Sequence, residues 1–413
     1  MRSRGFRGRP GPALVVALLA LLLFGCTHGD GIPLDPLPTG SGRTELRLGD
    51  GTRALSSGPG YKASPAWSPD GERIAFVVDG YVVDRDVGGG PERVWTAKDL
   101  GVSRVSWDSR GSLLATLSPQ PEEGEERPET RTQQLRRVQA PGGENPGPVS
   151  TVLEGALATA PYAGSNEAGT LVAVQSGGGS TLVLVRGGRV ARPYPATVRG
   201  TVSGMSVSPD GSRVVAASRD ETGEYLLTIV GLEDGSATEV LTLPEGEGVI
   251  GAPQWAPGGI YYLTGERSGS QSSGSQAEGY TPQRLYLLRS ENRDPEPAPG
   301  LGSGFVASSI QLSPEGTELA VLGRLGSDAP INVYILDLES SRLRSLTTNE
   351  DMEIRNGPED LAWSPDGENL AVIARGTSPA SRTYSAPADS LLEAFYNVYS
   401  VPVEQPQDSE ERT

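Results

Sequence analysis

The sequence predicts an all-β fold, a seven-bladed β-propeller of four-stranded antiparallel blades whose ring is closed by an N-terminal strand. Three observations lead to this prediction. A turn phrase recurs along the chain, a short apolar run follows each copy, and a spare hairpin near the N-terminus matches a missing strand near the C-terminus. The 55 glycines and 34 prolines among 413 residues add frequent breaks between those runs, which favours strands and turns over helices.

The turn phrase "AWSPDG" occurs at 66–71 and again at 362–367. Its Ser-Pro-Asp-Gly core suits a type I β-turn: Ser can bond to the backbone two residues on, Pro presets φ, Asp is tolerated third and Gly fits fourth. The runs that follow, such as "RIAFVV" and "LAVIA", lack polar alternation and are typical of strands covered on both faces. Looser copies are "WDSRGS" (107–112), "VSPDGS" (207–212), "WAPGG" (255–259) and "LSPEGT" (312–317).

Each unit continues with an alternating strand, a hairpin and an outer strand, so one unit supplies four strands. Seven turn glycines mark the units, and the weakest marker stands in the eroded phrase "YAGSNEAGTLVAV". Their spacing fits repeats of about 40–50 residues with four strands each, lengthened in places by polar inserts, and such repeats are the signature of a β-propeller. The markers are Gly71, Gly111, Gly169, Gly211, Gly258, Gly316 and Gly367.

The two ends of the chain predict how the ring closes. The segment 396–404 echoes the third strand of the preceding unit, and no outer strand follows it. A hairpin at 44–57 precedes the first turn phrase and has no blade of its own. An N-terminal strand within 44–57 is therefore expected to pair with residues near 396–402, because this removes the open sheet edge. Either "TELRL" or "TRALSS" could fill the place.

The start of the chain, 1–25, predicts a lipoprotein signal peptide. A basic stretch precedes an apolar run at 13–24, which is shorter than the roughly 20 residues of a membrane-spanning helix and fits a secretory signal. The run ends in "LFGC", which resembles the lipobox of bacterial lipoproteins, with Phe24 bulkier than usual. The resemblance implies that Cys26 carries the acyl chains, palmitate among them, and becomes the mature N-terminus. A plain secretory signal with an incidental Cys26 is the alternative.

The other boundaries follow from composition. Residues 26–42 are polar and rich in Gly and Pro, as a flexible tether would be. The propeller is predicted over 43–404, and 405–413 is expected to be a disordered acidic tail. Cys26 is the only cysteine, so no intrachain disulfide is possible.

The chain is acidic, with 35 Lys and Arg against 52 Asp and Glu. Its formal net charge of −17 becomes −21 once the four arginines of the signal peptide are removed. Such a surface repels nucleic acid and anionic lipid headgroups, and it keeps a protein soluble. Nucleic-acid binding is therefore not expected.

The tryptophan, the Ser-Pro-Asp-Gly turn and the apolar strand together resemble the WD-like repeats of TolB-type propellers, which also form the propeller half of actinobacterial LpqB-type lipoproteins. The resemblance covers roughly 44–404, in five clear copies and two eroded ones, and it implies the fold more than the function. Both families carry an extra domain before the propeller, whereas Cys26 and Arg43 are only 17 positions apart. The partner contacts of that domain are therefore not carried over. TolB itself is a soluble periplasmic protein.

Few residues are candidates for chemistry. The only histidine is His28 in the expected tether, so a Ser-His-Asp centre lacks its base and a histidine-ligated metal is excluded from the propeller. No catalytic, cofactor-binding or metal-binding residue is predicted, although oxygen-only calcium binding stays open. Tyr261 and Tyr262 could line a ligand surface, but their place in an apolar run favours the core. The acids of the turns, Asp70, Asp210, Glu315 and Asp366, are explained by the turns themselves.

The expected function is a membrane-anchored extracytoplasmic propeller that acts as a non-catalytic protein-binding or scaffold module of the cell envelope. Its partners would be the membrane, through the lipid anchor, and an envelope protein. The alternative is a cell-surface hydrolase or lyase that acts on carbohydrate through a carboxylate pair. Carboxylates outside the turns that converge on the central channel would favour the enzyme, whereas an empty or apolar channel mouth would favour the binding module.

Overall fold

The computed structural model describes residues 51–57, 60–108, 110–117, 133–143, 145–164, 167–267, 280–291, 293–326, 329–347, 353–357, 359–375 and 396–403. The chain divides into two units, Met1–Glu45 and Leu46–Thr413, and the described residues all belong to the second. The signal peptide (1–25), the tether (26–42), the tail (405–413) and Cys26 therefore lie outside the described residues, as does the "TELRL" half of the N-terminal hairpin.

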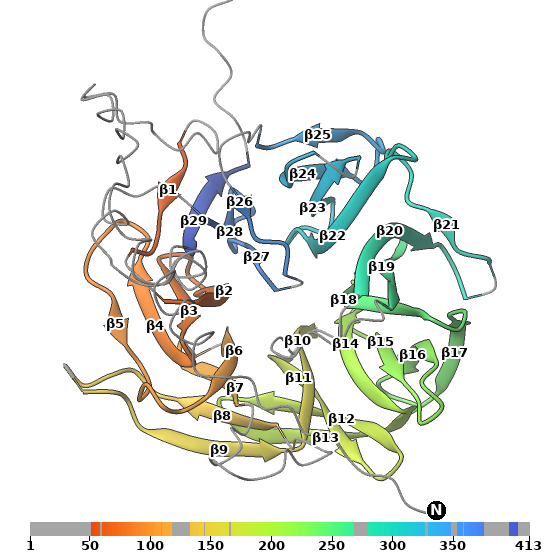
Figure 1. Ribbon diagram of the computed structural model, residues 1–413. Coiled ribbons are helices and arrows are strands. Elements are labelled where there is room, and N and C mark those ends of the chain that lie inside the picture. Colours follow the sequence, from red (N-terminus) through yellow and green to blue (C-terminus); the bar gives the residue numbers. More distant parts are fainter. Residues whose placement is uncertain are drawn as a thin grey trace, which may run out of the picture. The chain divides into compact units, whose positions relative to one another are not determined.

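The second unit is all-β and forms a seven-bladed β-propeller, as the sequence predicts (Figure 1). Each blade is an antiparallel sheet whose strands follow one another from the channel outward. Blades 1 to 4 comprise β2 (Lys62–Trp67), β3 (Arg73–Val78), β4 (Tyr81–Asp86), β5 (Arg93–Val94); β6 (Val102–Trp107), β7 (Leu113–Leu117), β8 (Gln134–Val138), β9 (Val149–Glu154); β10 (Ala156–Gly164), β11 (Glu167–Ser176), β12 (Gly179–Arg186), β13 (Arg189–Arg199); and β14 (Thr201–Val207), β15 (Arg213–Arg219), β16 (Tyr225–Gly231), β17 (Ala237–Thr242).

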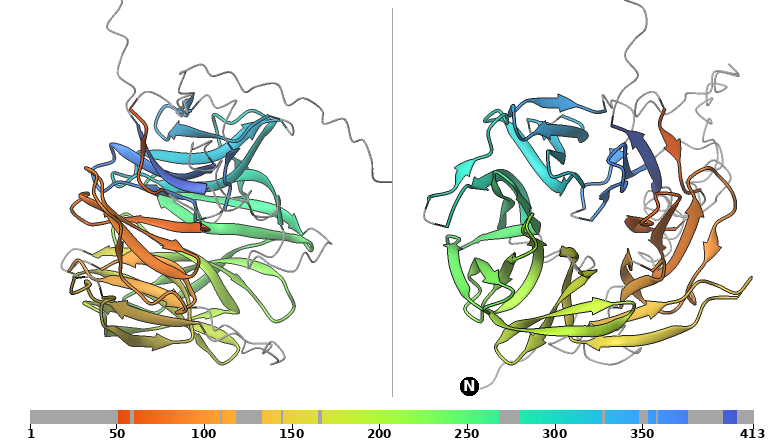
Figure 2. Two further views of the ribbon diagram at one scale, coloured as in Figure 1. Left: turned by 60° about the vertical axis from the view of Figure 1, so that its left-hand side comes forward. Right: turned by 180° about the vertical axis from the view of Figure 1, so that it is seen from behind.

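The remaining blades complete the ring, which Figure 2 shows from the side and from behind. They comprise β18 (Glu247–Ala256), β19 (Gly259–Arg267), β20 (Tyr280–Leu288), β21 (Glu296–Pro297); β22 (Phe305–Leu312), β23 (Glu318–Leu325), β24 (Asn332–Asp337), β25 (Leu343–Ser345); and β26 (Glu353–Ile354), β27 (Leu361–Trp363), β28 (Asn369–Arg375), β29 (Tyr396–Pro402) with β1 (Arg53–Ala54). None of the described residues forms a helix that could cross a membrane.

The repeated turn forms where it was expected, but its serine bonds to the aspartate side chain and not to the backbone two residues on. In blade 1 the Ser68 hydroxyl donates to the Asp70 carboxylate (2.5 Å), which also accepts the Glu72 amide (3.1 Å). The Gly71 amide bonds to the Ser68 carbonyl (2.9 Å), and Gly71 has a φ of +73° that favours glycine. The same arrangement recurs at 208–211 and 364–367.

One of the seven turn markers is wrong. Gly169 lies inside β11, opposite Tyr162, and the β10–β11 turn falls between Gly164 and Glu167. A β-carbon at Gly169 would lie 2.7 Å from the Val185 carbonyl oxygen, so this glycine permits close approach of β12 and does not form a turn. Gly258 does lie in a turn, the two-residue connection between β18 and β19.

Neighbouring blades pack through buried apolar side chains and are joined by indole hydrogen bonds. Trp67 and Trp363, the residues before the two identical turns, are each 8% exposed, as the repeat register predicts. Each indole donates to the inner strand of the preceding blade: Trp67 to Ala362 of blade 7 (3.1 Å), Trp107 to Ala66 of blade 1 (2.9 Å) and Trp363 to Gln311 of blade 6 (2.9 Å). Tyr261 and Tyr262 are 3% and 1% exposed, which confirms their place in the core.

The ring closes as predicted, and the "TRALSS" half of the hairpin supplies the strand. Arg53 and Ala54 of β1 pair antiparallel with Ser400 and Tyr399 of β29. The Leu55 amide continues the ladder with a bond to the Val398 carbonyl (2.8 Å). The pairing makes β1 the outer strand of blade 7 and covers the edge of β29 (Figure 1).

Candidate functional site

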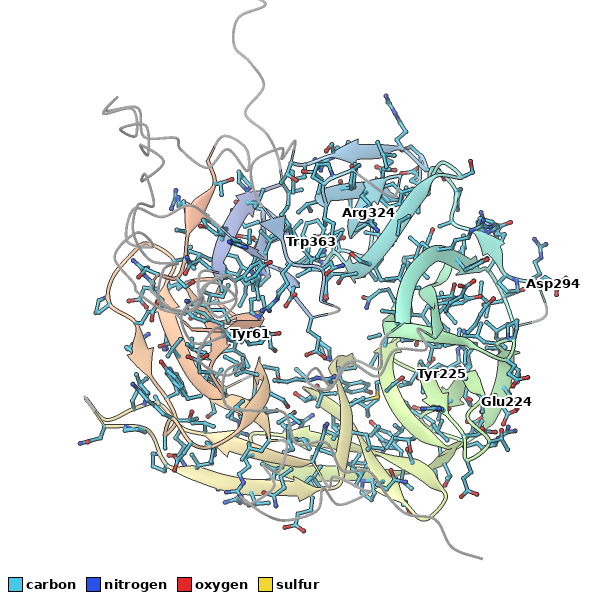
Figure 3. All side chains as sticks on the ribbon, in the orientation of Figure 1. Tyr61, Glu224, Tyr225, Asp294, Arg324 and Trp363 are labelled. Atoms are coloured by element: carbon cyan, nitrogen blue, oxygen red, sulfur yellow. The ribbon has the colours of Figure 1, made fainter. Side chains whose placement is uncertain are left out.

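The innermost strands of the blades enclose a central channel of about 2550 Å³. Figure 3, which looks along the axis, shows side chains from all around the ring pointing into it. Much of its wall consists of small or neutral polar side chains. Lining residues of this kind are Ser64, Ser103, Ser106, Thr159, Ser203, Gly204, Ser206, Gln254, Ser308 and Gln311.

Most inner strands share an irregularity that redirects side chains. In blades 1 to 6 the pairing of the inner strand with its neighbour shifts register. Such shifts bend a strand and re-aim its residues. The shifts fall between Ala63 and Ala66, Val102 and Arg104, Ala156 and Ala158, Val202 and Gly204, Ile250 and Gln254, and Ala307 and Ser309.

Blade 7 departs further, because its inner strand is split. β26 and β27 both pair with β28, and the described residues between them, 355–357 and 359–360, belong to neither strand. This excursion occupies the place of the register shifts in the other blades. It contains Arg355, Glu359 and Asp360, which all line the channel. The split strand thus brings three charged groups to a wall that is otherwise mostly uncharged.

A buried ion pair holds the excursion in place. Arg355 donates two hydrogen bonds to Asp360 (2.6 and 2.5 Å), and Asp360 also accepts the Gly357 amide (2.8 Å). Burial lowers the pKa of Arg355, but the hydrogen bonds and charge of Asp360 outweigh it, so the net shift is upward. The guanidinium also lies 4.5 Å from the ring centre of Tyr61 on blade 1. These contacts make the excursion a fixed part of the wall.

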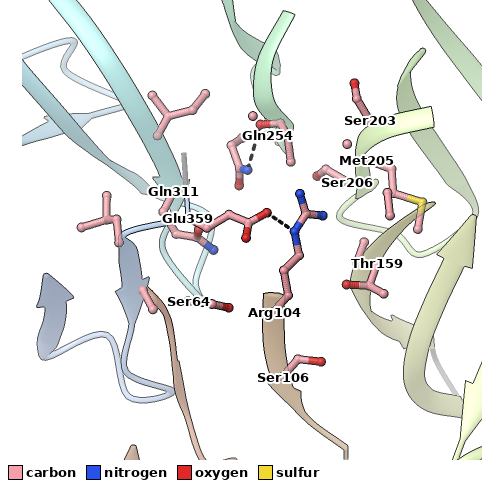
Figure 4. Close-up of a pocket in the computed structure, with 18 of the residues that line it drawn as sticks. Ser64, Arg104, Ser106, Thr159, Ser203, Met205, Ser206, Gln254, Gln311 and Glu359 are labelled. Atoms are coloured by element: carbon pink, nitrogen blue, oxygen red, sulfur yellow. Dashed lines mark hydrogen bonds and ion pairs between the residues drawn. The ribbon is translucent and has the colours of Figure 1, made fainter. Parts of the chain in front are cut away.

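A second ion pair crosses the channel between blades that are not neighbours. Arg104, at the register shift of β6 in blade 2, donates its Nε to Glu359 of blade 7 at 2.5 Å (Figure 4). The pair passes in front of blade 1, where Ser64 has a φ of +51° and its hydroxyl accepts the Val105 amide (3.1 Å). Both side chains keep access to the channel, at 37% and 38% exposure.

The channel changes the ionisation of Glu359. Although its side chain is accessible to water, the walls surround it, and this desolvation raises the pKa of the carboxyl while Arg104 lowers it. The nearby Asp360 adds to the upward shift, and the net direction is upward. The Arg104–Glu359 pair therefore combines a permanent cation with a carboxyl that takes up a proton more readily than an exposed glutamate.

Three of the acids that line the channel are held by arginines. Glu359 and Asp360 lie outside the turns, and each is paired with an arginine. At the rim of blade 4, Asp220 accepts hydrogen bonds from Arg199 (2.5 Å) and from its own loop. Among the described residues, no three His, Cys, Asp or Glu side chains are placed to hold a metal ion. Glu221 and Glu315 also line the channel and form no ion pair with a described residue, so the channel acids do not by themselves separate the two expected functions.

The turn acids behave as structural groups. Asp70, Asp210 and Asp366 each accept the serine hydroxyl of their own turn (2.5 Å), whereas the carboxylate of Glu315 lies against the Gly367 turn of blade 7. Neither Arg104 nor Glu359 was predicted from the sequence. Their sequence signals were a charge inside an inner strand ("SRVSW") and a turn phrase ("NGPED") just before the last copy.

The turn aspartates predict a weak acid dependence of stability. The Ser208 hydroxyl and the Ser212 amide lower the pKa of Asp210 from 3.8 to about 2. Because the folded-state pKa is the lower one, this stabilisation is complete above a pH of about 4 and is lost as the pH falls towards 2. Asp210→Asn should flatten the fall in unfolding free energy over that range by less than about 1 kcal/mol, since the group is exposed. A fall as steep as the wild type's, in urea unfolding of both proteins at each pH, would contradict this.

Comparison with known proteins supports the propeller fold and does not indicate a function. No protein-family profile matches the sequence, and no curated protein sequence matches it either. The β-propeller domain of the Trilobed protease from Pyrococcus furiosus is 10% identical, with 84% of this chain and 97% of that chain covered at a TM-score of 0.51. A chain of the mitotic checkpoint complex is 14% identical, with 86% and 94% covered at 0.50.

A putative TolB from Agrobacterium tumefaciens is also similar, at 14% identity with 85% of this chain and 94% of that chain covered, at a lower TM-score of 0.40. At such identities the likeness to solved structures concerns the fold alone. The Pyrococcus domain is described as having an open velcro topology, whereas β1 and β29 close the ring of this chain.

Proposed function

We propose that this protein is a lipid-anchored, extracytoplasmic β-propeller that binds an envelope protein and has no catalytic activity of its own. The observation that carries the proposal is the pairing of two of the channel acids with arginines. Glu359 and Asp360, which lie outside the turns, are neutralised by arginines held on the same frame. A carbohydrate-cleaving site needs one carboxyl to donate a proton and another to attack or to activate water, so these paired groups support a binding role.

The rigidity of the frame also supports a binding role. Indole and backbone bonds link successive blades, and the closed ring presents two faces whose loops are held at fixed positions. Rigid surfaces lose little conformational entropy on association, which favours protein docking. The Ser-Pro-Asp-Gly turns resemble those of TolB-type and LpqB-type propellers, and we include a similar role in the cell envelope in the proposal.

The anchor rests on the sequence around Cys26. The basic stretch, the short apolar run and "LFGC" support cleavage before Cys26 and its acylation. An extracytoplasmic, membrane-bound position follows from that anchor. The acidic surface makes anionic lipid a poor second attachment, so the acyl chains would provide the membrane affinity.

Acyl labelling and envelope pull-down test the proposal together. Cys26→Ser should lose the acyl label and leave the membrane fraction, while Thr27→Ala, the adjacent control, should keep both. Crosslinking in the native envelope, followed by capture of the wild-type protein, should recover a protein partner. A wild-type protein without acyl label would contradict the anchor. Cleavage of an envelope polysaccharide by the purified protein, abolished by Glu359→Gln, would replace the binding role with the carbohydrate-active alternative.

A further inference from the structure

The β12–β13 connection of blade 3 gathers positive charge on an otherwise acidic protein. Four arginines surround its tip, two from the hairpin itself and two from blade 2. The hairpin lies in the yellow-green lower part of Figure 1. We name this group the arginine cluster: Arg110, Arg137, Arg186 and Arg189.

Two members of the cluster face each other across the hairpin. Gly187 and Gly188 form a two-residue turn with φ of +56° and +69°, and this turn pairs Arg186 directly with Arg189. Like charges directly opposite each other on paired strands are destabilising. The sequence nevertheless places two arginines there, beside a turn that holds them together.

The other two members approach the same turn from blade 2. A β-carbon on Gly187 would lie 3.1 Å from Nη1 of Arg110, and one on Gly188 would clash with Cδ of Arg137. Both guanidinium-bearing side chains therefore contact the hairpin tip. Any side chain in place of these glycines would displace them, so the turn type and the charge cluster depend on each other.

Two members of the cluster have partners of their own. Asp108 lies 3.8 Å from Arg137 and its Oδ2 has no hydrogen-bond partner, while Arg186 donates to the Ala168 carbonyl (3.3 Å) and takes part in a further interaction. Within the described part of the chain, Arg110 and Arg189 take part in no ion pair, although both are exposed. Other exposed arginines of the described part vary: Arg213 is matched by Glu291 (2.8 Å) and Arg289 by Glu296 (2.6 Å), whereas Arg293 and Arg342 form no ion pair with a described residue.

We propose that the arginine cluster is a docking site for an acidic segment of a protein partner. Carboxylates of such a segment would accept hydrogen bonds from Arg110 and Arg189 and add negative charge beside the facing pair Arg186 and Arg189. This rests on the proposed function and deepens it, because it names the docking surface and the chemistry of the partner.

The charge of the whole molecule favours a peptide over a membrane surface. With a formal net charge of −17, the protein as a whole is repelled by an extended anionic bilayer. A narrow acidic segment can lie over the hairpin tip alone, within the roughly 8–10 Å over which charges act at physiological salt.

A binding titration with synthetic peptides tests the site on the full-length protein. Fluorescein-labelled octaglutamate should bind the wild type in a salt-sensitive manner, and octaglutamine should not bind. Arg110→Gln with Arg189→Gln should weaken octaglutamate binding about fivefold, because each exposed charge contact is worth a fraction of a kcal/mol. Arg293→Gln with Arg342→Gln is the matched control. It removes the same charge from exposed arginines on the corresponding connections of blades 5 and 6 and should change the affinity less than about twofold.

Three outcomes would overturn the proposal: no binding of octaglutamate, equal weakening in both double variants, or binding to phosphatidylglycerol vesicles that depends on Arg110 and Arg189 while octaglutamate does not bind. Equal Tm values for both double variants would show that neither change acts through folding. Recovery of the same envelope partner by both double variants would place docking elsewhere and leave the proposed function standing.

Discussion

Replacing residues 51–57 by a Gly-Ser linker of equal length is expected to unfold the whole ring. Leu55 is 2% exposed and packs with side chains of blades 7 and 1, and truncating a buried leucine costs about 2–5 kcal/mol. The hydrogen bonds of the closure, among them that of the Val398 amide to the Ser56 hydroxyl (2.8 Å), add about 1 kcal/mol each. The sum approaches the whole stability of a typical domain, about 5–15 kcal/mol.

Urea unfolding and amide exchange measure this effect. The variant should lose its cooperative transition, and slow exchange should disappear across β29 as well as at the replaced segment. The same linker in place of 405–413 is the control and should leave the transition unchanged. A ring that kept its stability to within about 1 kcal/mol, the worth of a single closure hydrogen bond, would show that β1 is dispensable, and the assignment of the outer strand of blade 7 would be wrong.

Asp84→Asn should have the second largest effect, about 1.5–3 kcal/mol, because it removes a buried carboxylate that accepts charge-assisted hydrogen bonds and leaves Arg73 and Arg93 only the exposed Asp86. Asp84 is fully buried and forms ion pairs with Arg73 and, in a two-pronged contact at 3.1 and 3.2 Å, with Arg93. Arg73 in turn lies against the rings of Trp95 and Trp107 (5.5 and 5.1 Å), at the interface of blades 1 and 2.

A neighbouring aspartate provides the matched control for this prediction. Asp86 contacts the same two arginines, at 3.7 and 3.2 Å, but its side chain is 56% exposed. Asp86→Asn should therefore cost no more than about 1 kcal/mol. Equal losses for the two variants in chemical unfolding would mean that burial does not set the strength of these pairs.

The fold was predictable because the information for it is local. Ser68, Pro69, Asp70 and Gly71 specify their turn through bonds within a few residues, and seven such units can be counted along the chain. The count survived even where one marker failed, because blade 3 replaces the Ser-Pro-Asp-Gly turn with a short connection between β10 and β11. Gly169 stands at the position that the repeat spacing predicts, but it lies inside β11 and allows β12 to approach closely.

The site was not predictable in the same way. Arg104 and Glu359 are 255 positions apart and meet only because blades 2 and 7 flank blade 1 in a closed ring. Only the turn acids could be identified from the sequence, because they stand in a repeated Ser-Pro-Asp-Gly phrase and Glu359 does not. The inner strand of blade 7 is split between β26 and β27, and the Arg355–Asp360 pair lies in the interruption.

The pairing of β1 with β29 also sets the order of events during synthesis. β1 leaves the ribosome before any other strand of the ring, yet its partner β29 is the last strand to be made, since Arg53 pairs with Ser400. Until then blade 7 lacks its outer strand, and the blades at the two ends of the growing arc have only one neighbour each. Contacts between such distant segments form slowly and leave strand edges open to wrong partners meanwhile. Completion of the protein is therefore a single late step, and a chain stopped before residue 396 would leave every earlier blade in an unclosed arc.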